Sequence, residues 1–256
     1  MITGGMTSKE MYDHLSEDLK KLHYRMDYYR PKAIKEIKRA YSFPAWKTYD
    51  YSVLETNNKY VIVFYVDNVN NIESPRELFF LDYHDDKKHF IVRWGASPYK
   101  QTPDSPMKLV RVLHVYESHF LKRYNERFLK DGSLMANEIA SRFLTRNDIS
   151  MPIEITEEIN RNIGKYGEYG KWGYRVNDGM CFAETFMEGT ASDDGDIKKY
   201  KVDAICIKYK TFVSETILTD NQNNAIMKDY WDKWTRSYLD FLRENNGEDL
   251  DLFLEP

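Results

Sequence analysis

The segment HVYESHFLKRYNERF, residues 114 to 128, holds the densest group of side chains in this chain that could take part in catalysis or binding. Two histidines, two arginines and two glutamates stand here beside four aromatic rings. A helical wheel from His119 to Lys130 separates two arcs, each about 100° wide. The apolar arc consists of Phe120, Leu121, Tyr124 and Phe128, and the polar arc of His119, Arg123, Glu126 and Arg127. Ser118 stands before the first turn, as an N-cap residue does.

The polar arc carries residue types that suit the cleavage of RNA without a metal ion. That reaction needs a base for the 2′-hydroxyl proton, an acid for the leaving oxygen and cations for the phosphorane charge. Histidine serves as acid or base near neutral pH, and arginine suits a phosphate. A hydroxyl or carboxylate on a facing strand would complete the site, and the candidates are Glu184, Thr185, Thr211 and Ser214. The alternative is an ordinary solvated helix face, with its charges paired at three- and four-residue spacing.

The order of these features resembles that of small bacterial ribonuclease toxins, in the group that joins barnase and the colicin ribonucleases. The resemblance covers residues 110 to 216: a strand, a helix with the pattern His-x-x-x-Arg-x-x-x-Arg, and later strands that end in a Thr- and Ser-bearing one. It implies a bacterial endoribonuclease that needs no metal or other cofactor. His119, Arg123 and Arg127 would act from the helix, with Thr211 or Ser214 on the last strand. This chain is longer than those toxins and mildly acidic, and its first hundred residues have no counterpart in them.

Metal and phosphate motifs give little support for other chemistries. The order His114-x-x-Glu117-x-His119 matches neither zinc helix pattern, H-E-x-x-H or H-x-x-E-H. His84 and His89 flank a predicted turn and would approach each other across a hairpin, although exposed hairpin histidines are common. The chain has no Walker or G-x-G-x-x-G loop. We therefore expect neither a metal site nor a cofactor.

The basic segment KKLHYRMDYYRPKAIKEIKRAY suggests a contact surface. From Lys20 to Ala40 there are eight Lys and Arg residues and two acidic ones. Interleaved tyrosine and arginine suit RNA or an acidic protein partner. The predicted contact residues are Arg25, Tyr28, Tyr29, Arg30, Lys35 and Arg39. A solvated helix face is the alternative, and the acidic segment ENNGEDLDLFLEP could also be an intramolecular mate.

Composition limits the class of protein. The chain has 256 residues, a net charge of −4 and 42% hydrophobic residues, which suffices for a core. The acidic balance argues against sequence-independent binding of duplex nucleic acid. No apolar run is long enough to span a membrane and no secretory signal is visible. Two cysteines, Cys181 and Cys206, are too few for a disulfide framework. We expect a cytoplasmic protein that does not contact the membrane.

Hydrophobic periodicity predicts the elements. Residues 7 to 30 form a helix that Pro31 interrupts or restarts, with a basic continuation to residue 41. The predicted strands are 49–55, 60–66, 77–84, 89–95, 110–116, 180–188 and 201–214. The predicted later helices are 119–130, 133–146, 156–163 and 221–244, with a Gly-rich stretch at 164–173.

The order of elements predicts an α+β fold with a largely antiparallel sheet and a long helix packed on it from each end of the chain. We expect one domain, 1–256, with residues 1–41 as an N-terminal basic helical segment. Two hypotheses stay open: a metal-independent endoribonuclease acting through the polar arc, and a non-catalytic protein that binds a partner through its basic, tyrosine-rich N-terminal helix.

Overall fold

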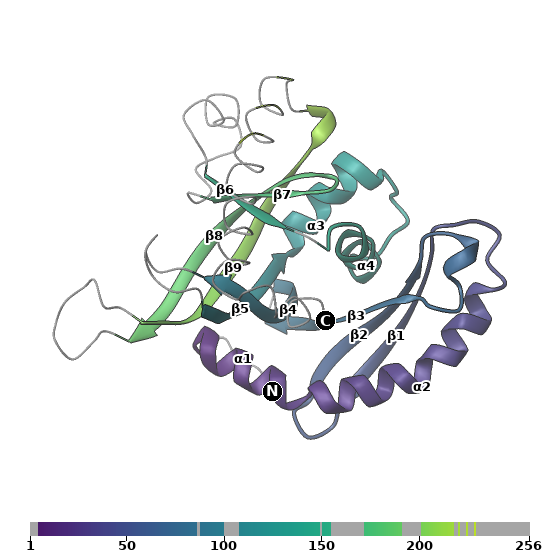
Figure 1. Ribbon diagram of the computed structural model, residues 1–256, viewed down its shortest axis with the longest axis horizontal. Helices are drawn as coiled ribbons and strands as arrows, with labels where there is room; N and C mark the ends of the chain where they lie inside the picture. Colours follow the sequence, from purple (N-terminus) through teal and green to yellow (C-terminus); the bar gives the residue numbers. More distant parts are fainter. Residues whose placement is uncertain are drawn as a thin grey trace, which may run out of the picture.

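The computed structural model describes residues 5–85, 88–99, 108–148, 150–154, 172–190 and 201–217, together with positions 220, 224 and 228. Its fold is α+β, built on one mostly antiparallel sheet of nine strands (Figure 1). The strands lie in the order β1-β2-β3-β4-β5-β9-β8-β7-β6. Neighbouring strands run antiparallel except β5 and β9, which pair in parallel at the middle of the sheet.

The first half of the sheet is a meander, as alternating apolar residues predict. Its strands are β1 (Ala45–Val53), β2 (Asn58–Val66), β3 (Arg76–Asp85), β4 (Lys88–Tyr99) and β5 (Lys108–Glu117). The predicted hairpins are confirmed, because β1 pairs with β2 and β3 with β4 in antiparallel register. Asn57 has a φ of 54°, a left-handed conformation that asparagine tolerates in a tight turn.

In the second half of the sheet the strands lie in reverse order of sequence, so that the last strand, β9, lies next to β5. Its strands are β6 (Met151–Glu154), β7 (Trp172–Val176), β8 (Gly179–Thr190) and β9 (Lys201–Ser214). At the β7–β8 turn Gly179 has a φ of +156° and lies against β9 so closely that an added Cβ would be 2.2 Å from the Val213 carbonyl oxygen. Only glycine fits this position without a shift of the backbone.

Two helices, rather than one, form the N-terminal segment: α1 (Ser8–Glu17) and α2 (Leu19–Ile37). The break lies at Asp18, whose buried carboxylate Oδ2 accepts hydrogen bonds from Thr56 Oγ1 (2.8 Å), Asn58 Nδ2 (2.9 Å) and Tyr60 OH (2.6 Å). The predicted interruption at Pro31 was wrong, because Pro31 lies inside α2. Pro31 is exposed, so water can satisfy the carbonyl group that a proline leaves without its helical donor.

The sheet separates two helical layers (Figure 1). On one face Leu15 of α1 and Leu22 of α2 pack against strand residues that include Val92. On the other face lie α3 (Ser118–Tyr124), the π-helical turn η2 (Asn125–Leu129) and α4 (Ala136–Arg146). Their largest core cluster joins Phe120, Phe143 and side chains from both halves of the sheet. Because both halves of the sheet contribute side chains to this cluster, its burial stabilises their association.

A buried polar network fixes α3 and α4 to the β7–β8 turn. Asp178 is 6% exposed and accepts hydrogen bonds from Tyr124 OH (2.7 Å), Asn147 Nδ2 (2.9 Å), Arg146 Nε (2.9 Å) and Arg146 Nη2 (2.7 Å). Burial alone would raise the pKa of Asp178, but these donors outweigh it and hold the pKa below its ordinary value. The ionised carboxylate therefore ties the helix that carries the polar arc to the sheet.

Several predictions lie outside the described residues. These are the helix at 156–163, almost all of the Gly-rich stretch and of the helix at 221–244, and the acidic C-terminal segment. Among the helices that are described, none is long and apolar enough to cross a membrane.

Candidate functional sites

Strand β5 runs directly into α3 at Ser118, one residue before the predicted start of the helix. The prediction of Ser118 as the N-cap was wrong, because Glu117 holds that position and makes no side-chain capping hydrogen bond. The apolar arc is buried: Phe120 and Tyr124 are 0% exposed and Leu121 is 2% exposed. His119 lies on the opposite side of the helix and is exposed. The amphipathic interpretation of this segment is therefore confirmed.

The two arginines of the arc are engaged in different ways. Arg123 donates a hydrogen bond from Nη1 to Glu126 Oε2 (2.9 Å), within the same arc. Arg127 instead reaches the sheet and donates to the backbone carbonyl oxygen of Phe212 in β9. The helix and the last strand thus meet through Arg127, by a contact that fixes the helix to the strand.

The strand candidates do not gather around this arc. Thr211 and Ser214 are 3% and 2% exposed, and Ser214 Oγ lies 3.1 Å from Thr216 Oγ1. Glu184 follows Ala183 in β8, and the Ala183 side chain belongs to the α3–α4 core. Because successive side chains of a strand point to opposite faces, Glu184 points to the other face of the sheet. There Glu184 pairs with Lys210 (3.3 Å). Sequence reasoning overlooked Lys210, which also pairs with Glu117 (2.6 Å).

His114, considered above as a metal ligand, lies on the same sheet face as Tyr209. Its Nδ1 is 3.1 Å from the Tyr209 hydroxyl oxygen. Desolvation, helped by the positive charge of Arg93, lowers the pKa of His114 to about 4. His114 is therefore neutral at physiological pH and serves the packing of the sheet face.

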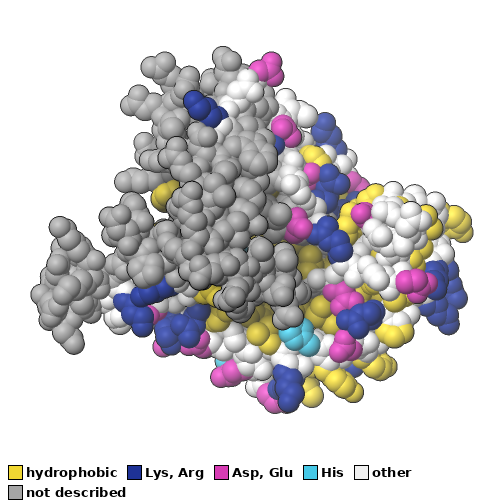
Figure 2. Space-filling view, viewed as in Figure 1, with side chains coloured by type: hydrophobic (Ala, Val, Ile, Leu, Met, Phe, Trp, Pro, Cys, Tyr) yellow, Lys and Arg dark blue, Asp and Glu magenta, His cyan; other side chains and the backbone are white. Residues whose placement is uncertain are grey.

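A second surface lies on the exposed side of α2. Six residues follow one another at steps of four, four, four, three and four, which places them on one helix face. They are Lys20, Tyr24, Tyr28, Lys32, Lys35 and Arg39, and all six are exposed; we call them the α2 stripe. Figure 2 shows side chains of the class that includes tyrosine beside Lys and Arg along the margin where α2 runs.

The predicted contact residues divide between this stripe and the sheet. Tyr28, Lys35 and Arg39 belong to the stripe. Tyr29 stacks on Tyr49 of β1, with ring centroids 4.5 Å apart. The remaining two, Arg25 and Arg30, hold α2 in place: Arg25 lies over the ring of Tyr51 (4.8 Å), and Arg30 pairs with Glu77 of β3 and with Asp27 (2.8 Å). Sequence reasoning missed Lys20, Tyr24 and Lys32, although their four-residue spacing was visible.

A hollow of about 650 Å³ adjoins the C-terminal end of the α2 stripe. It lies between α2, the start of β1 and α4, and Arg39 belongs both to its lining and to the stripe. Trp46 lines the hollow, and the Arg142 guanidinium lies 5.1 Å from the centre of the Trp46 ring. The lining also includes Lys47 and two acidic residues, Glu36 and Glu138, and Lys47 pairs with Glu36 (3.5 Å).

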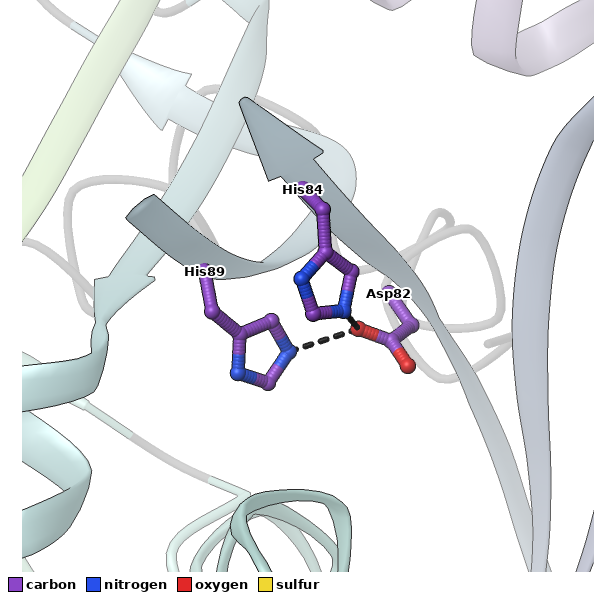
Figure 3. Close-up of side chains that lie close together, drawn as sticks. All are labelled: Asp82, His84 and His89. Carbon is purple, nitrogen blue, oxygen red and sulfur yellow. Dashed lines mark hydrogen bonds and ion pairs between the residues drawn. The ribbon is translucent and has the colours of Figure 1, made fainter. Parts of the chain in front are cut away.

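The third group is a cluster on the β3–β4 hairpin, formed by Asp82, His84 and His89 (Figure 3). Both histidine Nε2 atoms converge on Asp82 Oδ1, at 3.2 Å from His84 and 2.6 Å from His89. Of the two alternatives left open by the sequence, the structure shows the approach of the two histidines, whose rings stack 4.3 Å apart. Sequence reasoning missed Asp82, although the two-residue spacing to His84 puts both on one face of a strand.

Comparison of the chain with protein-family models, with curated proteins and with solved structures finds no match. The geometry of the described residues therefore carries the functional argument.

Proposed function

We propose that this chain is a non-catalytic interaction protein whose α2 stripe binds an acidic surface of a partner protein. The observation that carries this proposal is the exposure of two neighbouring tyrosines, Tyr24 at 73% and Tyr28 at 64%. Tyrosine is among the residues that contribute most to protein interfaces when a partner covers it. Here the rings lie in line with cations on the same helix face.

The charge of the stripe determines the kind of partner. The stripe has four cationic side chains, on Lys20, Lys32, Lys35 and Arg39, and no acidic member. One of the four, Lys32, lies 3.9 Å from Glu36 beside the stripe. The stripe runs from Lys20 to Arg39, which lies two residues beyond the end of α2. Its helical part is roughly 27 Å long, which suffices for one side of a standard interface.

The shape of the stripe favours a protein over RNA. A helix presents a convex ridge, which fits into a groove of a folded partner. Asp27 is 67% exposed beside the stripe, paired with Arg30. An RNA backbone carries a negative charge at every nucleotide, so the Asp27 carboxylate would repel it. A protein partner can instead place an uncharged residue opposite Asp27.

Fluorescence anisotropy tests the proposal with two labelled probes: a random copolymer of glutamate and tyrosine, and a 20-nucleotide poly-uridylate. In about 0.15 M salt, we expect the copolymer to bind and the RNA to bind far more weakly. The Tyr24→Ala/Tyr28→Ala variant should weaken copolymer binding at least about tenfold. Lys32→Ala/Lys35→Ala should weaken it as well, and the remaining binding should depend less on salt.

Two substitutions on other helices serve as controls. Met135→Ala removes an apolar side chain that is 74% exposed, and Lys122→Ala removes a cation that is 73% exposed. Neither should change copolymer binding. Preference for the RNA, absence of copolymer binding at 100 µM, or equal effects of control and stripe variants would each overturn the proposal.

We keep cleavage of RNA as a second candidate because of one observation, the contact of Arg127 with β9. This contact brings the polar arc against the strand that the toxin resemblance assigns to the site. The test is a mixed-sequence fluorogenic RNA in the presence of EDTA. Cutting that His119→Ala abolishes and Lys122→Ala preserves would support this candidate, and absence of cutting by folded protein would refute it.

A further inference from the structure

The hairpin cluster gathers its side chains through strand geometry. His84 of β3 and His89 of β4 are direct cross-strand partners in the antiparallel register. Asp82 precedes His84 by two residues and therefore projects from the same face of β3. Cross-strand partners have Cβ atoms about 5 Å apart, which brings two imidazoles and one carboxylate together without any loop.

The distances within the hairpin cluster match those between ligands of one metal ion. The candidate ligand atoms of Asp82, His84 and His89 all lie within 4.8 Å of one another. Zn²⁺ binds nitrogen and carboxylate oxygen at about 2.0 to 2.2 Å, so tetrahedral neighbours around it are about 3.3 Å apart. The 3.2 Å separation of His84 Nε2 from Asp82 Oδ1 is close to that value. The 2.6 Å separation of His89 Nε2 from the same oxygen is a hydrogen-bond distance, so this pair would have to open by about 0.7 Å around an ion. Small rotations of the two stacked rings would aim both lone pairs at a shared ion.

Surrounding residues hold the cluster in this arrangement. Asn137 of α4 donates a hydrogen bond from Nδ2 to Asp82 Oδ2 (2.8 Å), which leaves Oδ1 directed at the histidines. Such outer contacts orient metal ligands in proteins. Asn137 Oδ1 is buried and has no hydrogen-bond partner among the described residues. Ser118 Oγ fixes the backbone beneath the cluster by donating to the carbonyl oxygen of His89 (2.7 Å).

The three side chains of the hairpin cluster differ in how far they are exposed to solvent. Asp82 and His89 are each 18% exposed, whereas His84 is 65% exposed. Two ligands are thus shielded from competing water, and the third leaves an entry path for an ion.

We propose that Asp82, His84 and His89 bind a divalent transition-metal ion of the zinc class. Two imidazoles suit zinc and its neighbours better than Mg²⁺ or Ca²⁺, which prefer oxygen ligands. Three protein ligands leave at least one coordination position for water or a small anion. The site is independent of the α2 stripe.

Isothermal titration of metal-free protein with Zn²⁺, and absorption spectroscopy with Co²⁺, test this proposal. We expect one ion per chain with a dissociation constant of 10 µM or below, and cobalt bands typical of low coordination number. His89→Ala and Asp82→Asn should each weaken binding at least a hundredfold, and Asn137→Ala should weaken it about tenfold. His119→Ala removes an exposed histidine elsewhere and should leave the titration unchanged.

His84→Ala keeps the test decisive if the more buried substitutions impair folding, because the His84 side chain is largely exposed. It should weaken Zn²⁺ binding at least tenfold without changing the thermal unfolding of the metal-free protein. Absence of stoichiometric binding at 100 µM Zn²⁺ would overturn the proposal. So would binding that His84→Ala and His89→Ala leave within threefold of the original, since this would be adventitious surface binding.

Discussion

Replacement of Asp178 by asparagine is expected to loosen the attachment of α3 and α4 to the sheet. The carboxylate accepts two hydrogen bonds from Arg146, one from Tyr124 and one from Asn147. An asparagine in the same place has a single acceptor oxygen and no charge. Its amide group would also face donors, so at least one buried donor would lose its partner.

The size of the effect follows from the burial of the network. Breaking a buried ion pair by removal of one partner costs about 3 to 5 kcal/mol. The Arg146 side chain is 36% exposed and can regain water, which places the expected loss lower. We expect a loss of about 2 to 4 kcal/mol in the free energy of unfolding, which lowers the Tm by roughly 4 to 16 °C.

Urea unfolding at pH 7, followed by circular dichroism, measures this loss. Asp13→Asn is the matched control, because that carboxylate is 43% exposed and its ion pairs should contribute at most about 1 kcal/mol. A loss below 1 kcal/mol for Asp178→Asn would refute the reasoning.

The pH dependence gives an independent check on the same pair. The folded-state pKa of Asp178 lies below its ordinary value, so the stabilisation is present above about pH 4. It is lost as pH falls through the lower folded-state pKa. The difference in stability between the original protein and Asp178→Asn should therefore shrink below pH 4, and a constant difference down to pH 3 would contradict the assignment.

Two further predictions concern single positions. Burial lowers the pKa of His114 from 6.5 to about 4, so its neutral form stabilises the fold above pH 6.5 and this contribution is lost as pH falls toward 4. His114→Gln should therefore reduce the loss of stability between pH 7 and 4.5 in urea titrations, and an unchanged slope would contradict this. Gly179→Ala should cost about 2 kcal/mol or more, because its Cβ would collide with the Val213 carbonyl. Gly132→Ala, where nothing lies within 4 Å of the added Cβ, is the control and should stay within about 0.5 kcal/mol in the same thermal melts.

Local patterns alone predicted many of the elements. The apolar runs in residues 60–66 and 201–214 marked strands, and β9 spans the full predicted range. The apolar arc of residues 120–128 is the buried side of α3 and the turn that follows. These predictions succeeded because side-chain alternation and helical spacing depend only on neighbours in sequence.

Contacts between distant residues overruled two local signals. A proline predicted a helix break, yet α2 continues through Pro31 because buried Ala33 and Ile37 hold its next turns against the sheet. Asp18 carried no breaking signal of its own, and the helix ends there because a carboxylate meets three donors from the β1–β2 hairpin. A buried polar network or a packed helix face contributes more to stability than the intrinsic helix propensity of a single residue.

The sequence by itself determined that the chain has an amphipathic segment with His119 at its start and a basic helix rich in tyrosine. Which side chains meet was decided by the tertiary structure. The parallel pairing of β5 with β9 joins two strands between which the described part of the chain forms α3, η2, α4 and strands β6 to β8. The pairing of β8 with β9 puts Ala183 in the α3–α4 core, so Glu184 faces the other side of the sheet, while the register of β3 on β4 places His89 opposite His84 and within reach of Asp82. Pairing and register depend on long-range burial, which spacing along one chain does not encode.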